Sequence, residues 1–151
     1  MNISFTNDEY TTLLEVLYLA DWILNAYDTE RSPSKSSYFD LEQKILSLSD
    51  KFEQKELVEF DDKYNEYIPS KIIEDGPVLD FIESYNEESF WEELIDRLSR
   101  RDLLKNYTES EVQEMEESVV LSEIEKYADV YAKEFEANGL MNIEISNIYD
   151  R

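Results

Sequence analysis

The segment from residue 7 to about residue 27 constrains the fold most, because apolar side chains occupy most sides of its helical wheel. A capping box stands at its start, with Thr6 at the N-cap and Glu9 three residues later. Phe5 and Tyr10 occupy the two positions of a hydrophobic staple. A helix that is apolar on most sides must be surrounded by other elements, so we expect it to be central.

The middle of the chain continues with apolar residues at helical spacing. After a polar loop, this spacing predicts helices over about 38–53 and about 55–67, and Pro69 helps to end the second. Gly76 and Pro77 predict a turn into a short helix, and Asn86 is placed to cap the next one. These signals are typical of a chain of short to medium helices.

A second capping box, Thr108 with Glu111, begins the last predicted helix, which reaches about residue 137. Gly139 follows as the left-handed residue after its end. The apolar stripe changes direction by about a quarter turn along this helix. We therefore expect a bend or a break near Ser118.

The predicted fold class is all-α, a compact bundle of about five or six helices with the N-terminal helix central. The length of 151 residues fits a single helical domain over residues 1–151. The two ends, "NISF" and "MNIEI", alternate apolar and polar residues. Two interpretations stay open for them: a short β pairing of the two termini, or extended tails packed on helices.

The charge excludes several partner classes. The chain has 37 acids and 14 bases, a formal net charge of −23, so direct binding to nucleic acid or to an anionic membrane surface is disfavoured. Its N-terminus has no basic region followed by an apolar run, and no apolar stretch is long enough to span a membrane. We expect a cytoplasmic protein.

With 42% hydrophobic residues the chain is too rich in core-forming side chains to be disordered.

The chain contains no cysteine and no histidine. This removes disulfides, thiol catalysis, histidine-based catalysis and the usual ligands of zinc, copper and iron. Asp61, Asp62 and Glu66 lie close enough in sequence for a magnesium site, but a solvated helix face is the simpler interpretation. No calcium-loop pattern or glycine-rich phosphate loop occurs. We expect no metal, no cofactor and no catalytic residue, hence a protein that is not an enzyme.

Three arginines gather in "FWEELIDRLSRRDL". Arg97 and Arg100 each follow an acid by one helical turn, which is the favourable orientation for a local ion pair. Arg101 lacks such an acid and lies at the edge of the apolar face. Asp21 lies on the apolar face of the first helix, where an unpaired carboxylate is costly. We therefore predict a buried structural ion pair between Asp21 and Arg101.

The density of acids near the last predicted helix is the strongest functional signal. Between residues 109 and 125 the chain has seven glutamates and no base: Glu109, Glu111, Glu114, Glu116, Glu117, Glu123 and Glu125. Like charges at this spacing oppose helix stability unless they serve a purpose. We interpret them as a partner-binding surface that covers a basic protein such as a nuclease, a toxin or a nucleic-acid-binding protein.

This interpretation describes an acidic, non-catalytic protein-binding module with an inhibitor, immunity-type or nucleic-acid-mimic role, by analogy of composition alone. One alternative is a carboxylate-based or Mg-dependent hydrolase, which demands acids converging in a pocket. Another is a helical protein whose acidity serves only solubility. A homodimer is a further open alternative, with the side of the last helix that carries Tyr127 and Tyr131 as its patch.

Overall fold

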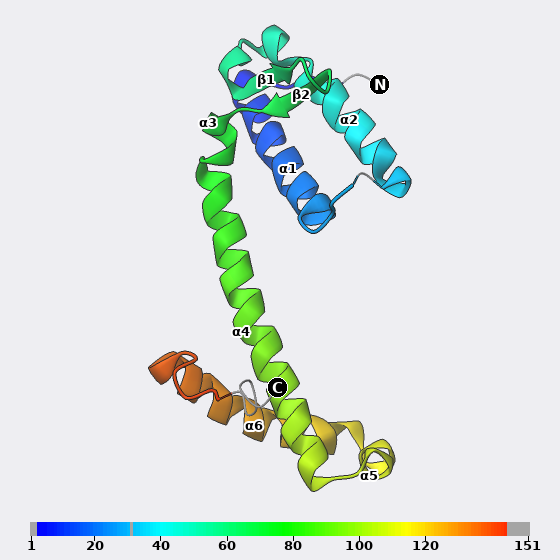
Figure 1. Cartoon of the computed structure of the whole chain (residues 1–151), viewed down its shortest axis with the longest axis vertical. Coiled ribbons are helices and arrows are strands. Elements are labelled where there is room, and N and C mark those ends of the chain that lie inside the picture. Colours follow the sequence, from blue (N-terminus) through cyan, green and yellow to red (C-terminus); the bar gives the residue numbers. More distant parts are fainter. Residues whose placement is uncertain (1–2, 31, 145–151) are drawn as a thin grey trace, which may run out of the picture. The chain divides into compact units, whose positions relative to one another are not determined.

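The computed structural model describes residues 3–30 and 32–144. Within them the chain is mostly α-helical and contains one small antiparallel sheet, so the predicted fold class is confirmed (Figure 1). The chain divides into two compact units, residues 1–85 and 86–151, and each is described by itself. The single domain predicted over 1–151 stays a prediction.

The first unit begins with the predicted central helix. The α-helices that lie wholly in it are α1 (Asn7–Asn25), α2 (Ser36–Leu46) and α3 (Lys71–Glu74). A short 3-10 turn, η1 (Pro33–Lys35), precedes α2. Two more, η2 (Ser49–Phe52) and η3 (Lys55–Leu57), lead from α2 to a hairpin of β1 (Val58–Asp61) and β2 (Glu66–Pro69). The Thr6–Glu9 capping box at the start of α1 is present in both directions, as predicted.

The core of the first unit forms around α1. Its buried cluster takes one or two apolar side chains from each of several elements: Tyr10, Leu14, Leu46, Leu57 and Ile73. Tyr10 stacks on Phe52 with ring centroids 4.2 Å apart and donates a hydrogen bond to the Ile45 carbonyl at 2.8 Å. Burial raises the pKa of Tyr10 to about 12. A tyrosine can lie here because its hydroxyl has a partner.

The helix predicted over 55–67 is wrong, since this segment forms the hairpin. The apolar residues of this segment have helical spacing: Leu57, Phe60, Tyr64 and Tyr67. The hydrogen bonds of a turn between them nevertheless determine the structure. The Asp61 carboxylate accepts hydrogen bonds from the backbone N–H groups of Lys63 and Tyr64, and Asn65 has φ 57°. Asparagine and aspartate are the residues that tolerate such turns.

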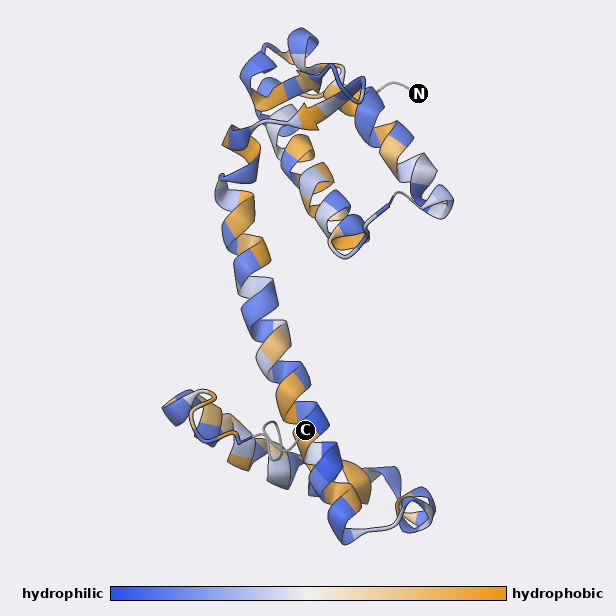
Figure 2. Ribbon diagram, in the orientation of Figure 1, coloured by the Kyte–Doolittle hydropathy of each residue, from blue (hydrophilic) through white to orange (hydrophobic). Residues whose placement is uncertain are grey.

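Two other boundaries differ from prediction. The helix expected over 38–53 ends at Leu46 as α2 and is followed by the separate turn η2. The cap predicted at Asn86 is wrong, because α4 (Pro77–Asn106) continues through it. No glycine or proline follows Pro77 within α4, and one asparagine inside a helix costs less than about 1 kcal/mol. Hydrophobic and hydrophilic residues alternate around this helix (Figure 2).

The second unit contains the C-terminal part of α4, then α5 (Glu109–Glu114) and α6 (Glu117–Asn138). The break predicted near Ser118 is confirmed: Met115 and Glu116 both have extended backbone between α5 and α6. Gly139 ends α6 with φ 56°, a conformation that favours glycine. The predicted pairing of the termini falls partly on residues 1–2 and 145–151, which lie outside the described residues; the sheet that is described joins β1 and β2.

Candidate functional site

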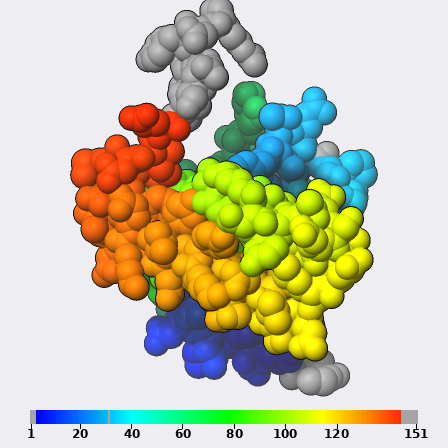
Figure 3. All heavy atoms as spheres, turned by 90° about the horizontal axis from the view of Figure 1, so that it is seen from below, coloured from blue at the N-terminus to red at the C-terminus, as the bar shows by residue number. Residues whose placement is uncertain are grey.

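The seven predicted partner-binding glutamates fall on α5, α6 and the link between them. Six of them are exposed, and Glu123 is half-buried. Two are used locally. Glu111 completes the second capping box with Thr108, which lowers its pKa, and Glu123 forms an ion pair with Lys126 at 2.5 Å. Figure 3 shows residues of α5 in yellow and α6 in orange on one visible face.

The break between α5 and α6 changes how these charges are explained. Glu109 is in the first turn of α5, Glu116 stands at the N-cap position of α6 without a side-chain capping hydrogen bond, and Glu117 begins α6. A helix N-terminus favours negative charge, so these three stabilise the ends where they lie. Glu114 ends α5, and Glu125 lies in the interior of α6; neither makes an ion pair with any residue that the structure describes. They are the two acids of the set without a local structural role.

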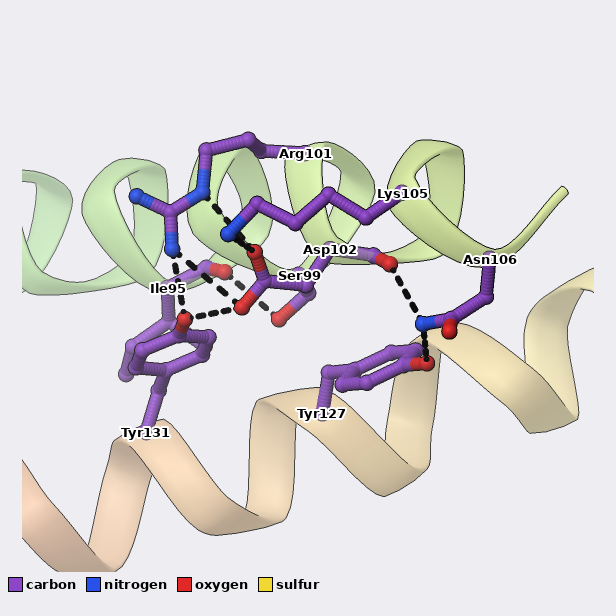
Figure 4. A network of polar contacts seen from close by, with 8 residues as sticks. All are labelled: Ile95, Ser99, Arg101, Asp102, Lys105, Asn106, Tyr127 and Tyr131. Atoms are coloured by element: carbon purple, nitrogen blue, oxygen red, sulfur yellow. Dashed lines mark hydrogen bonds and ion pairs between the residues drawn. The ribbon is translucent and has the colours of Figure 1, made fainter. Parts of the chain in front are cut away.

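A polar network centred on Asp102 joins α4 to α6 (Figure 4). Its carboxylate accepts hydrogen bonds from Arg101 at 2.9 Å and from the Tyr131 hydroxyl, and it forms an ion pair with Lys105 at 2.6 Å. These partners, Arg101 first, hold the pKa of Asp102 far below its ordinary value. Burial and the bond to Asp102 raise the pKa of Tyr131. Asp102 is thus fixed in the ionised form.

Two further contacts complete the junction of α4 with α6. Asn106 donates a hydrogen bond to the Tyr127 hydroxyl at 2.7 Å (Figure 4). Ser99 is fully buried and donates to the Ile95 carbonyl at 2.7 Å, so it adds no unsatisfied polar atom. Sequence reasoning missed Asp102, although its spacing to Lys105 was a local signal.

The predicted pair of Asp21 and Arg101 would join residues of the two units, so it stays a prediction. Asp21 accepts a hydrogen bond from Asn25 at 2.6 Å. Arg101 binds the adjacent Asp102 and also donates to the Tyr131 hydroxyl at 2.8 Å. The predicted local pairs are confirmed, with Arg97 on Glu93 at 2.7 Å and Arg100 on Asp96 at 2.8 Å. The arginines therefore bind acids on their own helix, and Arg101 also binds α6 through Tyr131.

Tyr127 and Tyr131 do not form the exposed patch that the homodimer alternative needs. Both are half-buried, and their hydroxyls bind α4 residues within the same unit. Tyr131 also stacks on Phe135, with ring centroids 5.7 Å apart, and Phe135 contacts Trp91 at 5.4 Å. Their role is to hold α6 against α4.

The first unit contains a cleft of about 480 Å³ between the end of α1, the loop before α2, α2 and β2. Acidic side chains dominate its polar lining: Asp21, Asp28, Glu30, Glu42 and Glu66. Lys35 reaches across to the Asp28 carboxylate at 2.5 Å and to the Leu24 carbonyl. Two of these carboxylates are held by neighbours in the lining, Asp28 by Lys35 and Asp21 by Asn25.

Metal and membrane sites can be compared with the predictions. Across residues 3–30 and 32–144, no group of three or more carboxylates has the arrangement to hold a metal ion. Asp61 binds its own turn, Glu66 lines the cleft, and the helix face expected to carry them with Asp62 does not exist. None of the described helices combines the length and the apolar character that crossing a bilayer requires.

Comparisons with known proteins add no relative: no protein-family model, no curated protein and no solved structure matches this chain.

Proposed function

We propose that this protein is an acidic, non-catalytic binding module whose α5–α6 surface covers a basic surface of a partner protein in the cytoplasm. The observation that carries the proposal is the exposed, unpaired state of Glu114 and Glu125 in the part of the chain that the structure describes. A capping box, a helix N-terminus or an ion pair explains each of the other five glutamates of the set, but none of these explains Glu114 and Glu125. A basic partner would bind them.

The net charge of −23 supports the same proposal. A field of one sign steers an oppositely charged protein toward the surface and raises its association rate. Repulsion among the glutamates is relieved when the partner's lysines and arginines approach. A nuclease, a toxin or a nucleic-acid-binding protein presents such a surface, because it must itself attract phosphate.

The test is a pull-down from a lysate of the source cell at low salt and at roughly 0.5 M salt, where the Debye length is well below 10 Å. The bait is the wild-type chain or the double variant Glu114→Lys/Glu125→Lys. A matched control, Asp40→Lys/Glu83→Lys, changes the net charge equally but at exposed positions of the first unit. We expect the wild-type chain and the control to retain one basic protein at low salt. The variant Glu114→Lys/Glu125→Lys should not retain it, and neither should the wild-type chain at high salt.

Equal retention by all three baits would contradict the assignment of the surface to α5 and α6. Retention that resists high salt would contradict the electrostatic mechanism. If no protein is retained, and the double variant is more stable than wild type, the acidity serves solubility and the binding proposal fails.

The cleft, with its five acidic side chains, is a place where the alternative, a carboxylate-based or Mg-dependent hydrolase, would lie. A general acid there needs a raised pKa. Hydrogen bonds lower the carboxyl pKa at Glu9, Asp102 and Glu111, and these three residues lie outside the cleft. None of these three therefore offers a general acid there.

A further inference from the structure

The two edges of the β1–β2 sheet differ in whether their outward backbone groups are hydrogen-bonded. On the β2 edge, the Gln43 side chain accepts a hydrogen bond from the Tyr67 N–H and donates one to the Tyr67 carbonyl, both at 2.7 Å. A single amide group thus takes the place of a neighbouring strand. Such closure is needed because an edge strand exposes backbone groups that pair readily with other chains.

Among residues 3–30 and 32–144, no side chain covers the β1 edge in this way. Phe60 lies opposite Tyr67 in the register. In an antiparallel pair, opposite residues either bond to each other or both point their backbone groups outward. Because Tyr67 points to Gln43, Phe60 must point away from β2; the bond from Ser70 N–H to the Leu57 carbonyl at 2.9 Å fits this alternation. No hydrogen bond within the described residues reaches the outward groups of Phe60.

The side chains along this edge define what it would accept. The Phe60 ring is 46% exposed and contacts Tyr67 on one face of the sheet. Glu59 and Asp61 project from the other face, since side chains alternate along a strand. Glu56 and Asp62 flank the strand and are exposed. The edge is therefore apolar on one face and acidic on the other.

We propose that β1 binds an extended peptide segment of a partner protein as a third strand, with alternating basic and apolar side chains. Backbone hydrogen bonds to Phe60 give affinity, and alternate side chains give specificity, as in other strand-addition complexes. A basic side chain lies beside Glu59, which is exposed, and the apolar ones lie beside Phe60. This surface belongs to the first unit and does not depend on the α5–α6 surface.

The first test uses two short synthetic peptides of equal composition, one alternating lysine and valine and the other with its lysines and valines in separate blocks. The readout is amide hydrogen exchange in the full chain, followed by NMR. We expect the alternating peptide to slow exchange of the Phe60 amide on the order of 10-fold at saturation, because that N–H becomes bonded. The block peptide should leave it unchanged.

Two substitutions at the same position separate backbone pairing from side-chain contact. Phe60→Pro removes the outward N–H without removing a bond of the β1–β2 ladder. Phe60→Val keeps the N–H and a side chain that favours strands. We expect the proline variant to bind the alternating peptide about 10-fold more weakly, and the valine variant to remain much closer to wild type.

Equal binding of the two peptides would overturn the proposal, because attraction would then be electrostatic only. An unprotected Phe60 amide in the complex would overturn it as well. If Phe60→Pro fails to fold, the alternating peptide is N-methylated along one edge: lost binding supports strand addition, and retained binding overturns it. Glu114→Lys/Glu125→Lys should leave the Phe60 protection intact, so this proposal and the proposed function can fail separately.

Discussion

The two units are held together by different chemistry. The first unit buries a cluster of five apolar or aromatic side chains around α1. In the second unit the buried residues are Ser99, Leu103 and Phe135, and much of the α4–α6 contact is made by hydroxyls, an amide and the Asp102 carboxylate. The first therefore depends on apolar area removed from water, and the second on the match of polar partners.

Tyrosines allow the second unit to use this solution. A tyrosine ring contributes apolar contact while its hydroxyl keeps a hydrogen bond, so it can cover a helix that is otherwise rich in acids. Tyr131 does both: its ring stacks on Phe135 and its hydroxyl donates to Asp102. The stability of this contact between α4 and α6 should therefore depend more on the charge of its residues than the stability of the first core does.

The largest expected effect is in the first core. Leu14 is 1% exposed, so Leu14→Ala should lower the free energy of unfolding by about 2–5 kcal/mol, through lost burial and a cavity. Val16→Ala, two positions away and 53% exposed, is the control and should change it by less than about 0.5 kcal/mol. Urea unfolding followed by circular dichroism measures both. Equal effects would remove the distinction between the units, because the core would then not depend on α1.

The next effect is at the polar junction. Asp102→Asn removes the charge that Arg101, Lys105 and Tyr131 share, and should lower the free energy of unfolding of the second unit by about 1–3 kcal/mol. Asp96→Asn breaks only the exposed pair with Arg100 and should cost about 0.2–1 kcal/mol. Urea unfolding followed by tryptophan fluorescence would compare them, since Trp91 contacts Phe135 in this unit.

The Asp102 contribution should also depend on pH. Its folded pKa is lowered, so the stabilisation is fully present above the ordinary aspartate value of about 3.9 and is lost as pH falls toward the folded pKa. The difference in unfolding free energy between wild type and Asp102→Asn should thus be constant near neutral pH and shrink below about pH 4. A difference that grows in acid would mean that Asp102 is not held ionised.

The smallest effects compare the two capping boxes. Thr6→Ala and Thr108→Ala each remove a cap of about 1 kcal/mol. Because α1 carries Tyr10 and Leu14 in the core, the first should lower global stability. The helix α5 has no buried residue, so the second should raise amide exchange within α5 and change global stability less. Thr→Ser at either position keeps the hydroxyl and is the control; equal global losses would contradict the contrast.

The sequence predicted what is decided locally. Both capping boxes, the break between α5 and α6 and the glycine at the end of α6 depend on residues within one or two turns of each other. The hairpin was missed because Phe60 and Tyr67 fit a helical spacing as well as a strand pair. The local turn signal at Asp61 and Asn65 was available, but it competed with that spacing.

The candidate site divides in the same way. The exposure of Glu114 and Glu125 follows from their polar spacing, whereas the structural reason for Glu117 became clear only from the position where α6 begins. The contact of Arg101 with Asp102 was not predicted, because residues one apart on a helix do not usually face each other. Tyr131, 30 residues along the chain, turns the guanidinium so that it reaches Asp102, and no spacing rule contains that contact.

The contrast between Gln43 and Phe60 also bears on which substitutions the sheet tolerates. At position 43 the side chain must present a donor and an acceptor together at the reach of Tyr67, a demand that glutamate, lysine and leucine each fail. At position 60 the outward groups belong to the main chain, so every residue except proline supplies them. Most substitutions of Gln43 would therefore leave the backbone groups of the β2 edge without a partner. Almost any substitution of Phe60 would keep the outward backbone groups of the β1 edge.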